Sequence, residues 1–347
     1  MKHIVKREWL ILILLGILWG VGIFYGCQAE QRGNQVSIRI KAKSEDTFTV
    51  KELTALYESE KAYKILGVPE ITGFGDMGRT KVFDPVTGRN MITDYMLVWG
   101  DKSLVYQGAL LDGSYGLWDS DECVITSKAA KELFQSENVV GLVLVWNHKE
   151  WVIRGVTDSS RPVILFTAGE GDDVSNLEFI FPKGSAAGLE TENMLSRNNL
   201  EKETVMIDYR LYGAICRLCY LLPCFYLLWL GLTRINIKPI KKGIIFTLLC
   251  FLLSSQMFRF PVTYIPSKWS DFDFWTAKWK GIILNAREIR ELIPLSQDIV
   301  FMRNVMISIA ASLAAGIGIV IYVILVHRAC RKSDSSFRSS QTSKSQK

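Results

Sequence analysis

The sequence predicts an α-helical membrane protein with four transmembrane helices and one large α+β domain outside the cytoplasm. Its 347 residues are 49% hydrophobic, which is ordinary for a soluble protein if the apolar residues are evenly spread. Here they concentrate at the N-terminus and around residues 211–233, 243–260 and 301–326. The stretch between the first two concentrations, roughly 180 residues, is long enough to form a core of its own.

The distribution of charge predicts the orientation of the chain. Residues 27–210 contain 20 Lys and Arg and 28 Asp and Glu, a net charge of −8, whereas the whole chain carries +6. The positive excess lies at 1–8, at 234–242 and in the tail 327–347. Basic residues that flank apolar spans mark the cytoplasmic side, so both termini are expected in the cytoplasm of a cell-membrane protein, with 27–210 and 261–300 outside. Basic residues that have this topological explanation do not indicate a nucleic-acid partner.

The first predicted span covers residues 9–26, which lack charged side chains and are just long enough to cross a bilayer. A cleaved signal peptide is the alternative, but the apolar core is long for one and no A-x-A cleavage site follows. We therefore predict an uncleaved anchor after a short cytoplasmic N-terminus.

The second predicted span, 211–233, is interrupted only by Arg217. That residue lies about 9 Å along the helix from its outer end. Its side chain can therefore snorkel to the interface. Alternatively, it is a functional charge that faces the interior of a helix bundle. The sequence leaves both possibilities open.

The last two predicted spans are 243–260, which is short, and 301–326. The last span carries Ser308, Ser312 and Gly316 at steps of four. Small residues at this spacing let helix backbones approach closely, so they are candidate helix-packing residues. The alternative is that this face of the helix contacts lipid.

The region 27–210 reads as a mixture of helices and strands, which is typical of an α+β domain. Thr49 and Ser127 are expected to cap two of its helices, and Pro85 and Gly88 mark a turn. The predicted strands are 35–42, 70–75, 79–84, 95–99, 122–126, 142–146, 151–156 and 176–181, and the predicted helices are 50–66, 128–134 and 184–197.

The sequence contains no recognisable catalytic, cofactor or metal site. His148 is the only histidine of the outer region, and the chain contains no P-loop. The seven cysteines give no disulfide framework. Cys216 and Cys219 form a C-x-x-C, but no second pair or histidine cluster completes a metal site, so the cysteines are expected to act as packing residues. We therefore predict a protein that is not an enzyme and binds no cofactor or metal.

One ordered set of short motifs resembles a known family. The run Asp121–Phe134 is followed by Val140-Gly141-Leu142 and by Trp151–Val156, and upstream lie Val98–Asp101 and Leu110–Gly113. In this order the motifs resemble the periplasmic core domain of MacB-like (FtsX-like) ABC transporter permeases, over about residues 35–165. The predicted layout is similar too, since those permeases have one span, a large outer domain and then three spans.

The resemblance implies a membrane (permease) subunit of an ABC-type exporter or mechanotransmission complex. Its partners would be a cytoplasmic ABC ATPase subunit, which hydrolyses ATP, and a second permease in a homodimer or heterodimer. The ATPase would contact the basic loop 234–242, whose candidate contact residues are Arg234, Ile235, Ile237, Lys238, Ile240, Lys241 and Lys242. This loop departs from the family pattern, because it has no carboxylate and contains Pro239. A non-transporting sensor or adaptor, whose outer domain binds a peptide or an envelope partner, is the alternative.

The outer loop 261–300 is predicted to contain an amphipathic helix capped by Ser270. Its apolar stripe begins with Phe272, Trp275 and Trp279, and aromatic rings of this kind settle at the headgroup level of a bilayer. These three residues are candidates for a helix that lies in the outer membrane interface. The alternative is a helix packed against the outer domain.

Overall fold

The computed structural model describes most of the chain and divides it into two units. The described residues are 2–41, 44, 46–63, 67–75, 78–106, 108–116, 120–234, 244, 247–248, 251, 260–265, 268, 270–292 and 296–344. The helical unit comprises residues 1–33, 210–261 and 298–347. The sheet unit comprises residues 34–209 and 262–297.

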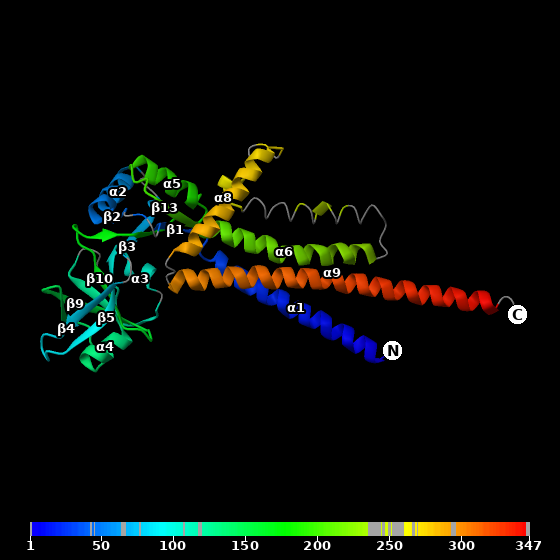
Figure 1. The fold of residues 1–347 in the computed structure, drawn as a ribbon, viewed down its shortest axis with the longest axis horizontal. Coiled ribbons are helices and arrows are strands. Elements are labelled where there is room, and N and C mark those ends of the chain that lie inside the picture. Colours follow the sequence, from blue (N-terminus) through cyan, green and yellow to red (C-terminus); the bar gives the residue numbers. More distant parts are fainter. Residues whose placement is uncertain are drawn as a thin grey trace. The chain divides into compact units, whose positions relative to one another are not determined.

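In the described part of the helical unit there are three long helices, α1 (Lys2–Glu30), α6 (Tyr209–Arg234) and α9 (Ser296–Lys344) (Figure 1). Among the described residues, two stretches are long and apolar enough to cross a membrane, Leu10–Glu30 and Asp298–Leu325. Helix α6 occupies the predicted second span. The predicted third span and the loop after Arg234 lie almost entirely outside the described residues.

Two helix boundaries differ from the sequence prediction. Helix α1 continues to Glu30, past the predicted end of the first span at Gly26. Helix α9 continues to Lys344, although the tail 327–347 is predicted to be disordered. Neither proline nor glycine follows Gly318 in α9, so no helix-breaking residue interrupts the backbone there.

Eleven strands form the main sheet of the described sheet unit, in the order β10-β7-β9-β8-β4-β5-β3-β12-β1-β13 with β6 beside β9. Strand β10 also pairs with β5, so six strands close a ring, four strands (β3, β12, β1 and β13) extend from it, and β6 pairs with β9 of the ring. The bounds are β1 Gln35–Ile40, β3 Glu70–Phe74, β4 Gly78–Phe83, β5 Asn90–Trp99, β6 Leu110–Gly113, β7 Glu122–Thr126, β8 Val143–Trp146, β9 Lys149–Thr157, β10 Val163–Thr167, β12 Asn176–Ile180 and β13 Thr204–Asp208. A second, two-stranded sheet pairs β2 (Phe48–Thr49) with β11 (Asp173–Val174).

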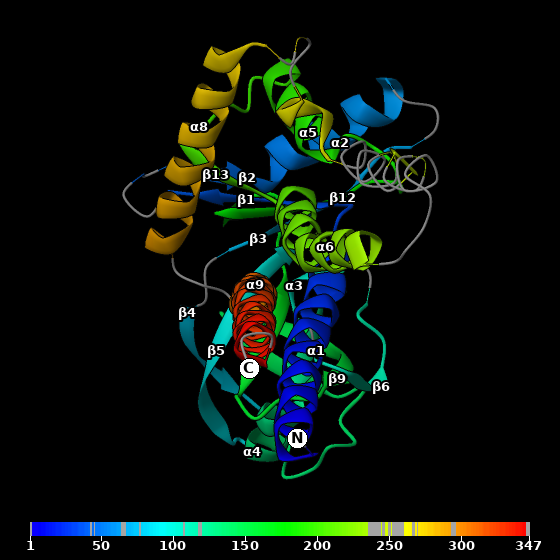
Figure 2. The ribbon, with the colours of Figure 1, turned by 90° about the vertical axis from the view of Figure 1, so that its right-hand side faces the viewer.

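Short helices bury the apolar faces of this sheet. Helices α2 (Val50–Tyr63) and α5 (Ala187–Arg197) cover the strands that extend from the ring, as both views show (Figures 1 and 2). Helix α4 (Ser127–Phe134) packs on the ring, and the one-turn helix α3 (Lys102–Val105) follows β5. Helix α8 (Phe272–Glu291), preceded by the short η1 (Val262–Tyr264), completes the unit. The mixture of helices and strands confirms the α+β class.

The capping residues were predicted correctly at one of three helices. Thr49 and Glu52 form a reciprocal capping box at α2, with backbone N–H to side-chain oxygen distances of 3.1 and 2.9 Å. The prediction of Ser127 as the cap of α4 was wrong, because Thr126, the last residue of β7, accepts the N–H of Ala129. At α8 the cap is Asp271, which accepts the N–H of Phe274, and not Ser270.

Candidate functional site

The candidate site is the contact between α1 and α6 within the helical unit, and each of these helices is close in sequence to a strand of the sheet unit. Helix α1 ends at Glu30 and β1 begins at Gln35, while β13 ends at Asp208 and α6 begins at the next residue. Strands β1 and β13 pair antiparallel from Val36 with Asp208 to Ile40 with Thr204. The two helices are therefore joined, through short or absent linkers, to neighbouring strands of one hydrogen-bonded ladder.

An ion pair joins α1 to α6 in the helical unit. Arg217 donates two parallel hydrogen bonds to the carboxylate of Glu30, from Nε at 2.8 Å and from Nη2 at 2.7 Å. The Tyr220 hydroxyl lies 3.0 Å from the same carboxylate. The two ionic side chains are only 16% and 23% exposed. A bidentate pair of this kind is both strong and directional.

This ion pair decides between the two interpretations of Arg217. The guanidinium faces α1 in the interior of the helical unit and does not extend along the surface. Glycine at position 213 permits the approach, because a Cβ there would lie 3.2 Å from the Glu30 Cα. Glu30 is a functional candidate that the sequence analysis did not include.

A second contact joins α1 to α9 through small residues. Ser308 and Ser312 are fully buried, and the Ser308 hydroxyl donates to the Gly22 carbonyl over 2.8 Å. A Cβ on Gly22 would lie 2.4 Å from the Ser312 hydroxyl, and one on Gly26 would lie 2.8 Å from the Ser308 hydroxyl. The two glycines form a G-x-x-x-G pattern, which lets helix backbones approach closely.

Gly316, the third predicted packing residue, lies beside α6. A Cβ at this position would meet Pro223 of α6 at 3.5 Å, which is an ordinary van der Waals distance. The structure therefore places Ser308 and Ser312 against α1 and Gly316 towards α6. Two further hydrogen bonds tie the three helices together, from the Trp19 indole to the Tyr220 carbonyl and from Asn304 to Gln28.

A buried polar cluster in the sheet unit holds the first residue of α6. Arg39 on β1 donates to Glu178 on β12 over 2.6 Å, and both side chains are less than one-tenth exposed. The hydroxyl of Ser37 lies 2.5 Å from the same carboxylate and 3.0 Å from the hydroxyl of Tyr209. Tyr209 is itself buried and begins α6. The cluster thereby holds the side chain of Tyr209 against two strands of the sheet.

The other predicted site residues fall into two groups. Of the candidate ATPase-contact residues, Arg234 is the last residue of α6, and those from Ile235 to Lys242 lie outside the described residues. Phe272, Trp275 and Trp279 all lie on α8 in the sheet unit.

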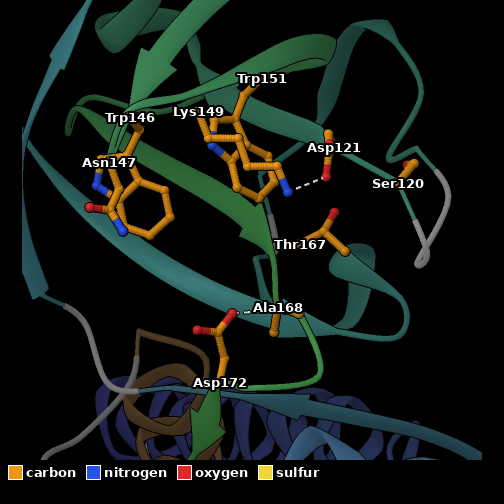
Figure 3. A pocket seen from close by; sticks show the side chains of 10 residues that line it. Ser120, Asp121, Trp146, Asn147, Lys149, Trp151, Thr167, Ala168 and Asp172 are labelled. Atoms are coloured by element: carbon orange, nitrogen blue, oxygen red, sulfur yellow. Dashed lines mark hydrogen bonds and ion pairs between the residues drawn. The ribbon is translucent and has the colours of Figure 1, made fainter.

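The sheet unit also contains a cleft of about 270 Å³ beside the β8–β9 hairpin. Figure 3 shows the ammonium of Lys149 paired with Asp121 next to the indoles of Trp146 and Trp151, with Asp172 on the other side of the cleft. The buried indole N–H of Trp151 has no hydrogen-bond partner in the described part of the chain. The sequence analysis did not single out this cleft, because its residues come from separate loops and strands.

No family model and no curated protein matches this sequence. Among solved structures, the periplasmic region of MacB from Actinobacillus actinomycetemcomitans is similar over 51% of this chain and 89% of its own, with 11% identity and a TM-score of 0.41. The extracellular domain of YknZ, a noncanonic ABC-type transporter from Gram-positive bacteria, is similar over 49% of this chain and 97% of its own, with 14% identity and a TM-score of 0.36. A likeness of this extent assigns neither a family nor a function to the chain.

Proposed function

We propose that this chain is the membrane (permease) subunit of an ABC-type exporter or mechanotransmission complex. It couples a separate cytoplasmic ATPase to the sheet unit, which lies outside the cytoplasm. The main observation behind the proposal is the ion pair between Glu30 and Arg217, which joins α1 to α6. In the sequence these two helices adjoin β1 and β13, which pair with each other. The order of the motifs that resemble MacB-like permeases supports the same function.

In this proposal the work of the chain is conformational. Closure of the ATPase moves the cytoplasmic loop 234–242, and a continuous helix transmits that movement along its axis. Because the ion pair joins the two helices, α1 moves together with α6. Tyr209, the first residue of α6, belongs to the buried cluster on β1 and β12, so movement of the helix would reach these strands through it. Rigid elements that move as a unit are a common means of long-range switching.

The partners follow from this mechanism. A subunit with its own P-loop supplies ATP hydrolysis, since this chain has no such motif. A second permease, identical or different, completes a symmetric assembly with two ATPases. The lipid bilayer surrounds the spans, and both termini lie in the cytoplasm.

The loop prediction is tested by changing its apolar residues only. Replacing Ile235, Ile237 and Ile240 by serine leaves the topology-determining charges in place. ATPase binding is expected to weaken by about tenfold or more, because apolar contact area is lost. The measurement is the amount of ATPase retained by the purified chain. The matched control replaces Thr233 and Asn236 by serine in the same segment, and equal retention by both variants would exclude docking at this loop.

The cleft shown in Figure 3 favours a second candidate function, that of a sensor or adaptor. Indole rings beside carboxylates suit a peptide or another envelope ligand with apolar and polar groups. Two results together would support this second function. The chain would function without an ATPase, and the Trp146→Ala variant would lose ligand binding.

A further inference from the structure

Helix α8 covers the exposed edge of the main sheet. Strand β13 is the last strand in the order, so one side of its backbone is left without a neighbouring strand. The side chain of Asn285 on α8 donates to the Met206 carbonyl of β13 over 2.8 Å. Glu288 pairs with Lys41, which follows β1, over 2.9 Å, and this hydrogen bond and charge raise the pKa of Lys41. One face of α8 is therefore attached to the strands that lead into the long helices.

The opposite face of α8 exposes large apolar side chains. Phe272 is 77% exposed, Trp279 is 58% exposed and Ile283 is 52% exposed. These positions are seven and then four residues apart, which places them within an arc of about 40° on one side of the helix. No residue of α8 is fully buried, so packing on the sheet unit does not account for this stripe. An exposed apolar stripe of this kind marks an interaction surface.

Basic side chains border the same stripe. Arg290 lies five helical turns after Phe272 and therefore on the same side of the helix. Lys280 and Arg287 lie within a quarter-turn of that side, measured around the helix axis. All three are exposed, and none of them forms an ion pair with another described residue. Apolar rings flanked by Lys and Arg are the composition of helices that lie in the headgroup region of anionic bilayers.

The chain holds α8 close to a membrane-crossing helix. Helix α8 ends at Glu291, and the apolar span in α9 begins at Asp298. Seven residues extend to at most about 25 Å, so the end of α8 remains within that distance of the start of the span. The C-terminal end of α8 is consequently tethered near the start of the span, whereas a protein partner would have to be recruited.

We propose that α8 has two functional faces. One covers β13, and the other, formed by Phe272, Trp279 and Ile283, lies in the outer headgroup region of the bilayer. Lys280, Arg287 and Arg290 contact anionic phosphate groups of the lipids there. The helix thereby anchors the edge of the sheet that continues into α6. This inference depends on the chain spanning a membrane and not on its coupling to an ATPase.

Quenching of tryptophan fluorescence by brominated lipids tests this proposal on the full chain in nanodiscs. Trp279→Phe is expected to reduce the fraction of emission that phosphatidylglycerol brominated near the headgroup can quench. The matched control is Trp146→Phe, which removes an indole in the cleft of the sheet unit and should raise that fraction slightly, because an unquenched emitter is lost. If the quenchable fraction of emission is equal in the two variants, Trp279 does not insert into the bilayer. The stripe would then be a binding surface for a protein partner.

The lipid charge is tested in the same preparation. Quenching is expected to be stronger in brominated phosphatidylglycerol than in brominated phosphatidylcholine. Replacing Lys280, Arg287 and Arg290 by glutamine should remove most of this difference, as should high salt, which screens exposed charges. Equal quenching of the unmodified chain in both lipids would overturn the role of the anionic headgroups.

Discussion

Replacing Glu30 by glutamine is expected to destabilise the helical unit by about 3 kcal/mol. The change leaves the Arg217 guanidinium charged and only 16% exposed, without the carboxylate that accepts two of its hydrogen bonds. An uncompensated charge in this position is costly, and more so in a helix that crosses a membrane. The free energy of unfolding in detergent, from denaturant titration of purified protein, measures the effect.

Two further variants make the Glu30 result specific. The double variant E30Q/R217Q removes both charges and should recover most of the lost stability, because two amides can hydrogen-bond to each other. Glu58→Gln removes an exposed carboxylate 4.0 Å from Lys61 and should change stability by no more than about 0.5 kcal/mol. If Glu30→Gln is no more destabilising than Glu58→Gln, the ion pair does not hold α1 and α6 together.

Replacing Gly22 by leucine is expected to separate α1 from α9. The new Cβ would lie 2.4 Å from the Ser312 hydroxyl, 3.2 Å from its backbone nitrogen and 3.3 Å from the Ser308 carbonyl oxygen. A change of the Ser312 rotamer can relieve the first contact but not the two contacts with backbone atoms, and the rest of the leucine side chain needs further space. Overpacking of this kind costs about 1–3 kcal/mol. The measurement is again the free energy of unfolding in detergent.

Helix α1 provides matched controls for this experiment. Gly16 and Gly20 have no atom within 4 Å of an added Cβ, so leucine should be tolerated at both positions. Ser312→Leu should reproduce the effect of Gly22→Leu from the α9 side of the contact, since Ser312 is fully buried. A similar loss of stability in Gly20→Leu and Gly22→Leu would show that glycine matters here for a reason other than helix packing.

Local sequence signals identify most elements of the sheet unit. The alternation of apolar residues predicts β1, and the capping pair of Thr49 and Glu52 marks the start of α2. Strands β10 and β13 were missed, although Val163–Thr167 is a continuous apolar run that is consistent with a strand buried on both faces. The closure of the ring by β10 and β5 depends on residues far apart in the chain, which local patterns do not reveal.

The sequence analysis singled out only some of the residues at the contacts of α1 with α6 and α9. Small residues at steps of four identified Ser308 and Ser312, and the same criterion applied to α1 would have identified Gly22 and Gly26. Glu30 was missed because the predicted span ends at Gly26, whereas the helix continues to Glu30. Its pairing with Arg217 is a contact across 187 positions of sequence, so hydropathy gives no sign of it.

Helix α8 shows how far periodicity can predict a surface. The spacing of Phe272, Trp275 and Trp279 predicts an amphipathic helix, and the helix is present. Periodicity does not tell which part of a wide apolar stripe is covered. In the structure Phe272 and Trp279 are exposed, while Trp275 lies partly shielded nearer to the side that packs on the sheet unit.

Purification of the intact chain from its native membrane, followed by identification of bound proteins and an assay of ATP hydrolysis, tests the proposed function most directly. We expect a P-loop ATPase to be present in stoichiometric amount, and the preparation to hydrolyse ATP although this chain has no P-loop. The variant with serine at positions 235, 237 and 240 should lose both. A homogeneous chain that carries no ATPase and hydrolyses no ATP would contradict the proposed coupling.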